Sequence, residues 1–113
     1  MTKITFFKKN NLFIGFKAEG HSGYSEAGTD IVCSAVSTAT QMTAVGLKQT
    51  LKMNVVVERN DKKGFLKLLF AKNSTNEEIL IAQPWFETLK ISLEDVEKDF
   101  KKYLSLEVKD EIN

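Results

Sequence analysis

The chain contains one histidine, His21, and one cysteine, Cys33, which stand twelve positions apart in the sequence. A thiol attacks a carbonyl carbon only as the thiolate, and an imidazole within hydrogen-bond reach can take the thiol proton. The partial positive charge at a helix N-terminus also favours the thiolate. If the fold brings the two side chains together, they predict a nucleophilic cysteine with a histidine as its acid and base.

The residues before Cys33 predict that it lies in the first turn of a helix. Asp30 is a typical N-cap residue, because its carboxylate can accept from the backbone N–H of Val32 or Cys33. Cys33 is then the third helical residue, and the free N–H groups of that turn could hold an oxyanion. Asp30 itself is predicted to be a structural cap, since its charge would oppose thiolate formation.

A loop with three glycines precedes this helix. Gly20, Gly23 and Gly28 fit turns, and they would also give the loop freedom to open for a substrate. Tyr24 either lines a substrate pocket or packs against the protein. Ser37, one helical turn beyond the cysteine, either positions the site or packs between helices. These five are candidate substrate-binding or loop residues.

Spacing alone also allows chemically inert roles. A lone cysteine near a helix start is most often a buried packing residue, and a lone histidine is often structural. One cysteine and one histidine are too few for a zinc site unless acids or a second chain complete it. No glycine-rich phosphate-binding loop follows a strand at the required spacing. We therefore expect no metal and no cofactor.

Composition indicates one cytoplasmic domain spanning residues 1–113. Apolar residues make up 42% and charged residues 27% of the chain, and the formal net charge is +1. This charge gives no electrostatic case for direct nucleic-acid binding. A lone cysteine cannot form an internal disulfide. The first ten residues do not resemble a signal peptide, and the uncharged stretch 31–47 is too short and too polar for a membrane span.

Hydrophobic periodicity predicts an α/β (α+β) fold with the element order ββαββαβ. One mixed sheet of about five strands would carry two main helices. The expected strands cover residues 2–8, 12–18, 54–59 and 65–71, with a last strand around Leu106, Val108 and Ile112. The expected helices run from residue 30 to near 52 and from residue 74 to about 103.

The first two strands are predicted to form a tight hairpin. Asn10 and Asn11 lie between them, and asparagine tolerates the positive φ that such a turn needs. A loose alternation of apolar residues places Leu12 and Ile14 on the same face as Phe16.

Three signals describe the helices. The first helix carries no charge until Lys48, so we expect either a second subunit or the second helix of the same chain to cover it. Ser74 and Glu77 have the spacing of a capping box at the start of the second helix. Pro84 is expected to break or kink that helix near Gln83.

The stretch GHSGYSEAGTDIVCSAVSTATQ resembles the signature of the ribosomal-processing cysteine protease (Prp) family. Members of that family show G-H-A/S-G-Y in a loop and G-x-D-I-V-C-A/S-A-V/I-S at the start of a long helix. The similarity extends over the whole chain in length and element order. The matching positions are Gly20, His21, Gly23, Tyr24, Gly28, Asp30, Ile31, Val32, Cys33, Ala35 and Ser37.

The resemblance implies a cytoplasmic endopeptidase in which Cys33 is the nucleophile and His21 the acid and base. Its substrate would be large-subunit ribosomal protein twenty-seven, from which a short N-terminal extension is removed during ribosome maturation. The extension is cut beside two aromatic residues, so a hydrophobic pocket is expected next to the dyad. The resemblance also implies a homodimer, which agrees with the uncharged first helix, and no membrane partner.

Two other functions stay open at this point. One is a non-catalytic ribosome- or RNA-associated dimer that contacts phosphates through lysines, although the near-zero net charge speaks against it. The lysines concerned are Lys3, Lys8, Lys9 and Lys17. The other is a thiol redox sensor, which would oxidise Cys33 reversibly, but the chain has no second cysteine to resolve the oxidised thiol.

Overall fold

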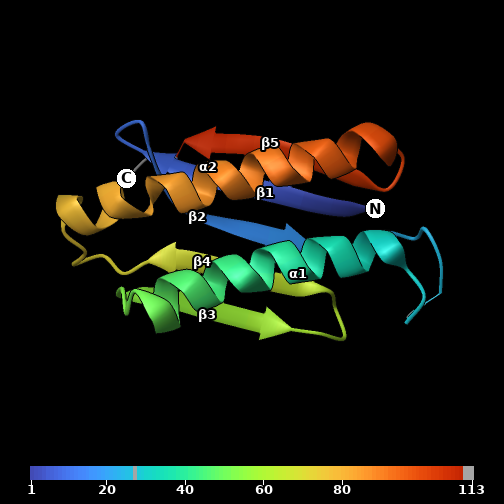
Figure 1. The fold of residues 1–113 in the computed structure, drawn as a ribbon, viewed down its shortest axis with the longest axis horizontal. Helices are drawn as coiled ribbons and strands as arrows, with labels where there is room; N and C mark the ends of the chain where they lie inside the picture. Colours follow the sequence, from blue (N-terminus) through green and yellow to red (C-terminus); the bar gives the residue numbers. More distant parts are fainter. Residues whose placement is uncertain (27, 111–113) are drawn as a thin grey trace.

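A five-stranded sheet carries both main helices on one of its faces (Figure 1). The computed structural model describes residues 1–26 and 28–110. In chain order the elements are β1 (Thr2–Lys9), β2 (Leu12–Glu19), α1 (Ile31–Val45), the π-helical segment η1 (Gly46–Thr50), β3 (Val55–Asn60), β4 (Phe65–Phe70), α2 (Asn76–Asp99) and β5 (Leu104–Asp110). This order confirms the predicted ββαββαβ arrangement. Ile112, which was included in the predicted last strand, lies outside the described residues.

The strands follow the order β3-β4-β2-β1-β5 across the sheet. Neighbouring strands run antiparallel except for β1 and β5, which run parallel, so the sheet is mixed as predicted. The last strand therefore pairs with the first, and Thr2 N donates to Tyr103 O at 2.9 Å where β5 begins. The loop that bears His21 leaves β2, the central strand, and crosses to α1.

The β1–β2 hairpin turns as predicted but contains a bulge. Asn10 and Asn11 have φ values of 51° and 65°, the left-handed conformation that a tight hairpin turn requires. The register shifts within the hairpin, where Ile14 is an extra residue on β2. Phe13 is consequently the residue that enters the core, at 5% exposure. Leu12 and Ile14 are only half-buried, so their predicted place on the core face is wrong.

The core lies between the sheet and the two helices. Phe13 and Phe16 of the hairpin contact Phe86 of α2, and Phe6 contacts Phe13 and Phe16, with ring centroids between 5.7 and 6.4 Å apart. Burying each such ring contributes about 1.5–3 kcal/mol. This packing fixes α2 against β2, the strand that ends at the candidate site.

The N-terminus of α2 uses Thr75 rather than Ser74 as its cap. Thr75 Oγ1 accepts a hydrogen bond from Glu78 N at 3.2 Å, and the Glu78 carboxylate lies 3.2 Å from the same hydroxyl. The predicted capping box is therefore displaced by one residue.

Pro84 does not break α2, which is continuous from Asn76 to Asp99. The preceding side chain holds the helix and the sheet together at this point. Gln83 Nε2 donates to Ile79 O and to Phe13 O, and Gln83 Oε1 accepts from Phe13 N, each at 2.8 Å. The predicted break near Gln83 is therefore wrong, because these bonds tie the turn around the proline to β2.

The two helices approach closely where α1 passes into η1. A Cβ on Gly46 would overlap the indole ring of Trp85, so only glycine permits this contact. α2 thus covers one side of α1, which was one of the two expected arrangements. The other side of α1 remains uncharged and exposes Ile31, Met42 and Val45.

Candidate active site

Helix α1 begins as predicted and places the thiol in its first turn. Asp30 is the N-cap, and its Oδ1 accepts from Val32 N at 3.0 Å and from Cys33 N at 2.9 Å. Cys33 is therefore the third residue of the helix, and its free thiol is half-buried. The sequence-predicted structural role of Asp30 agrees with these bonds.

Asp30 also holds the loop between β2 and α1. Its Oδ2 accepts from Ser22 Oγ, from Tyr24 N at 3.1 Å and from Ser25 N at 3.2 Å. The residue is only 5% exposed. Burial alone would raise the pKa of this carboxyl, but the hydrogen bonds from Ser22 and three backbone N–H groups outweigh burial and lower the pKa to about 2. The loop is thus folded around a buried carboxylate that is ionised at neutral pH.

The N–H groups of the first helical turn are already occupied. Val32 N and Cys33 N donate to the Asp30 carboxylate, and Ser34 N donates to Asp30 O at 3.0 Å. These groups therefore do not offer the oxyanion site that the sequence predicted. A different amide faces the thiol: Ser22 N donates to Cys33 Sγ at 3.3 Å.

His21 lies on the opposite side of the site and contacts the turn between β3 and β4. Its Nε2 is 2.9 Å from Lys62 O. Because a carbonyl oxygen can only accept, Nε2 is the donor and carries a ring proton. Within residues 1–26 and 28–110, no hydrogen bond joins the imidazole to Cys33.

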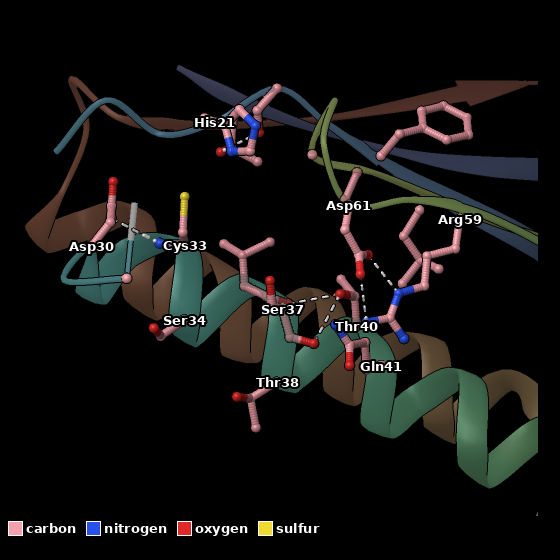
Figure 2. A pocket seen from close by; sticks show the side chains of 18 of the residues that line it. His21, Asp30, Cys33, Ser34, Ser37, Thr38, Thr40, Gln41, Arg59 and Asp61 are labelled. Carbon is pink, nitrogen blue, oxygen red and sulfur yellow. Dashed lines mark hydrogen bonds and ion pairs between the residues drawn. The ribbon is translucent and has the colours of Figure 1, made fainter. Parts of the chain in front are cut away.

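A cavity of about 570 Å³ lies between α1 and the β3–β4 turn. Figure 2 shows His21 and Cys33 facing each other at one end of this cavity, with Arg59 and Asp61 at the other. Arg59 Nε donates to Asp61 Oδ1 at 2.7 Å. The volume falls within the usual range for ligand pockets. The cavity lining combines apolar side chains, among them Val36, Phe65 and Leu66, with polar side chains of α1: Ser34, Ser37, Thr38, Thr40 and Gln41.

The five candidate loop and substrate residues divide between the cavity and its surroundings. Gly20, Gly28 and Ser37 line the cavity, whereas Gly23 and Tyr24 do not. Gly20 is also required by the backbone, because its φ is 87° and a Cβ there would lie 2.7 Å from a main-chain oxygen of the first residue.

Tyr24 packs against the C-terminal part of the fold. Its ring makes edge-on contacts with Phe100 and Tyr103, with centroid distances of 5.3 and 5.2 Å. This is the packing alternative of the two expected for Tyr24. The ring anchors the loop to the junction between α2 and β5.

Sequence reasoning missed several contributors to the site. Ser22 was not among the candidate residues, yet it is 2% exposed and bonds to both the cap and the thiol. Lys62 contributes a main-chain oxygen, which no side-chain pattern reveals. Gly64, also not among the candidates, is a neighbour of the imidazole.

In the described part of the chain, no group of three or more His, Cys, Asp or Glu side chains is arranged to hold a metal ion. Among the helices within residues 1–26 and 28–110, none combines the length and apolar character of a membrane span.

A half-buried thiol at a helix start, facing an imidazole across a peptide-sized cavity, provides the groups of a cysteine peptidase. The family model described as "Cysteine protease Prp" matches residues 1–105. The chain therefore belongs to this family and is a cysteine protease, which confirms the resemblance seen in the sequence.

Solved structures share the fold over nearly the whole chain. The ribosomal processing protease Prp from S. aureus with a covalently linked product peptide superposes with a TM-score of 0.83 at 20% identity, covering 96% of this chain and 100% of that one. The same protease with a substrate peptide gives 0.79 at 18% identity and the same coverage. The protein SMU.848 from Streptococcus mutans gives 0.80 at 22%, covering 98% and 96%. No curated protein matches the chain by sequence.

Proposed function

We propose that the protein removes the N-terminal extension of large-subunit ribosomal protein twenty-seven during ribosome maturation in the cytoplasm. The observation that carries the proposal is the placement of Cys33 and His21 on facing walls of one cavity, in a chain of a protease family. The S. aureus protease that shares the fold is described as a ribosomal processing protease and holds a substrate peptide. Membership of this family also disfavours the non-catalytic alternative.

In the proposed reaction Cys33 Sγ gives its proton to the His21 imidazole and attacks the scissile carbonyl carbon. The protonated imidazole passes that proton to the leaving amine as the C–N bond breaks, and the extension stays on sulfur as a thioester. His21 then takes a proton from water, whose oxygen attacks the thioester and releases the free thiol.

Substrate binding has to bring the thiol and the imidazole within hydrogen-bond reach. In the structure Ser22 N donates a hydrogen bond to Cys33 Sγ. A peptide carbonyl that accepts from this amide would release Cys33 Sγ toward His21, and the same amide would stabilise the developing oxyanion. Gly20 and Gly23 flank the His21–Ser22 pair at φ values of 87° and 76°, so this segment can adjust at low cost.

A peptide assay tests the proposed function. The purified protein is incubated with a peptide that spans the extension and its junction with the mature ribosomal protein, and the products are identified by mass spectrometry. We expect one cut that leaves the mature N-terminus. A matched peptide with both aromatic residues at the junction replaced by serine should stay intact. An uncut natural peptide, together with salt-sensitive binding of the protein to ribosomes, would instead favour the non-catalytic dimer.

We further propose a homodimer joined through the uncharged side of α1. Met42 is 66% exposed, Ile31 and Val45 are also exposed, and α1 carries no charged residue. A surface of this kind is suited to a second copy, because burying it desolvates no charge.

Sedimentation equilibrium checks this assembly. We expect a mass twice the 12.8 kDa of the chain for the wild type. Met42→Arg should shift the equilibrium to the monomer, because it places a charge in the interface. Leu80→Arg is the matched control, since Leu80 is 55% exposed on α2, and this variant should remain dimeric. A wild type that sediments at 12.8 kDa at all concentrations contradicts the proposal.

A further inference from the structure

Two main-chain oxygens of the turn between β3 and β4 bind the segment that carries His21. Lys62 O accepts from His21 Nε2, and Gly64 O accepts from Gly20 N, each at 2.9 Å. One short turn therefore binds both the imidazole of His21 and the backbone N–H of the preceding residue, Gly20.

The turn itself is held by three further interactions. Gly64 N donates to Asp61 O at 3.2 Å, and Asn60 Oδ1 accepts from Lys63 N at 3.2 Å. Arg59, near the end of β3, forms an ion pair with the Asp61 carboxylate. The position of the Lys62 carbonyl is consequently set by the strand ends rather than by its own exposed side chain.

Gly64 lies directly against the imidazole. Its φ is 60°, and a Cβ built there would lie 3.1 Å from His21 Cε1 and 3.1 Å from Gly20 O. A methyl group at this position would displace either the ring or the turn, because both distances are shorter than ordinary van der Waals contacts.

We propose that the Lys62 carbonyl is the third member of the site, a positioning group that fixes the proton of neutral His21 on Nε2 and leaves Nδ1 to accept the Cys33 proton. This inference rests on the proposed function. A neutral imidazole has one N–H, and the Lys62 carbonyl, which can only accept, binds it. When the Sγ–H bond breaks and the Nδ1–H bond forms, Nε2–H stays on the carbonyl, whose dipole stabilises the imidazolium. Nδ1 then gives the proton to the leaving amine. An orienting carboxylate has the same role in other nucleophile–histidine pairs.

Nuclear magnetic resonance provides a direct test, because the chain has a single histidine. In the ¹⁵N-labelled wild type, at a pH where the ring is neutral, we expect the ring proton on Nε2. The ¹³C signal of the Lys62 carbonyl should shift in His21→Ala. Neutral wild-type rings with the proton on Nδ1, or a Lys62 carbonyl signal insensitive to His21→Ala, would overturn the inference.

Kinetics of Gly64→Ala supply the second test. We expect kcat to fall roughly 10- to 100-fold with KM changed less than about threefold, and the preference of the ring proton for Nε2 to be lost. Gly23→Ala carries a similar backbone penalty at φ 76°, but a Cβ there meets no atom within 4 Å, so this variant should keep the ring proton on Nε2. Lys63→Ala, which alters an exposed side chain of the same turn, should keep the wild-type kcat.

The outcomes separate the two proposals. Gly64→Ala with a wild-type kcat despite altered ring signals would overturn the role of Lys62 while the protease function stands. A wild type that carries the ring proton on Nε2 but cuts no extension peptide would overturn the proposed function, and with it the catalytic part of this inference.

Discussion

Replacing Cys33 with alanine should reduce cleavage of the extension peptide by roughly 10⁴- to 10⁶-fold, the loss expected when the atom that carries the acyl group is removed. His21→Ala should cost less, about 10²- to 10⁴-fold, because it removes proton transfer but leaves the nucleophile. The measurement is kcat/KM for the peptide under identical conditions, with product formation followed by mass spectrometry.

The fold should survive the removal of the thiol. Cys33 Sγ is half-buried, and among residues 1–26 and 28–110 its polar contacts are limited to Ser22, so we expect the free energy of unfolding to change by at most about 1 kcal/mol. Alkylation of Cys33, the only cysteine, should inactivate the wild type without unfolding it. The same reagent should leave the fold of Cys33→Ala unchanged. Wild-type cleavage rates in Cys33→Ala would refute the assignment of the nucleophile.

Replacing Asp30 with asparagine should lower the free energy of unfolding by about 2–4 kcal/mol at neutral pH. Both oxygens of the Asp30 carboxylate accept hydrogen bonds, whereas the amide of asparagine has only one oxygen. If that oxygen keeps the cap bonds to the helix, its NH₂ group faces Tyr24 N and Ser25 N, which then lack an acceptor. The loop that presents His21 and Ser22 should loosen, so activity should fall together with stability.

The same carboxylate gives the protein a defined acid sensitivity. Its pKa is about 2 in the folded protein and 3.8 ordinarily, so the unfolded chain binds more protons between these values. The contribution of Asp30 is therefore complete above about pH 4, and about 2 kcal/mol of it is lost as the pH falls toward about 2. Urea unfolding at a series of pH values measures this slope.

Glu26→Gln is the control for this experiment, because Glu26 is exposed in the same loop. It should keep the neutral-pH stability within about 0.5 kcal/mol and preserve the acid slope. In Asp30→Asn, the free energy of unfolding should depend less steeply on pH, by the contribution of one titrating carboxyl. An unchanged slope in Asp30→Asn would show that the carboxylate is not the group that titrates.

Local signals in the sequence were sufficient where a residue acts on its immediate neighbours. The Asn10-Asn11 turn and the Asp30 cap depend on φ preferences and on bonds to residues two or three positions away. Such interactions are encoded within a few residues, so the strands, the helices and the helical position of Cys33 could be predicted.

Predictions failed where partners are distant in sequence or belong to the main chain. Pro84 was expected to break or kink the second helix, but the helix is continuous, and Gln83 bonds to Phe13, seventy positions away. The bulge at Ile14 depends on the pairing register rather than on the alternation of side chains. The Lys62 oxygen that binds His21 is present in every residue type, so no pattern of residues could indicate it.

The parallel pairing of the last strand with the first has a consequence for synthesis. Thr5 and Glu107, 102 positions apart, are joined by a hydrogen bond, and Tyr24 of the site loop rests on Phe100 and Tyr103. Contacts of such long sequence separation form only after the whole chain is available. A nascent chain therefore exposes its histidine and cysteine well before the segment that anchors their loop. We therefore expect the loop that carries His21 to reach its final packing only after the segment that forms β5 has left the ribosome.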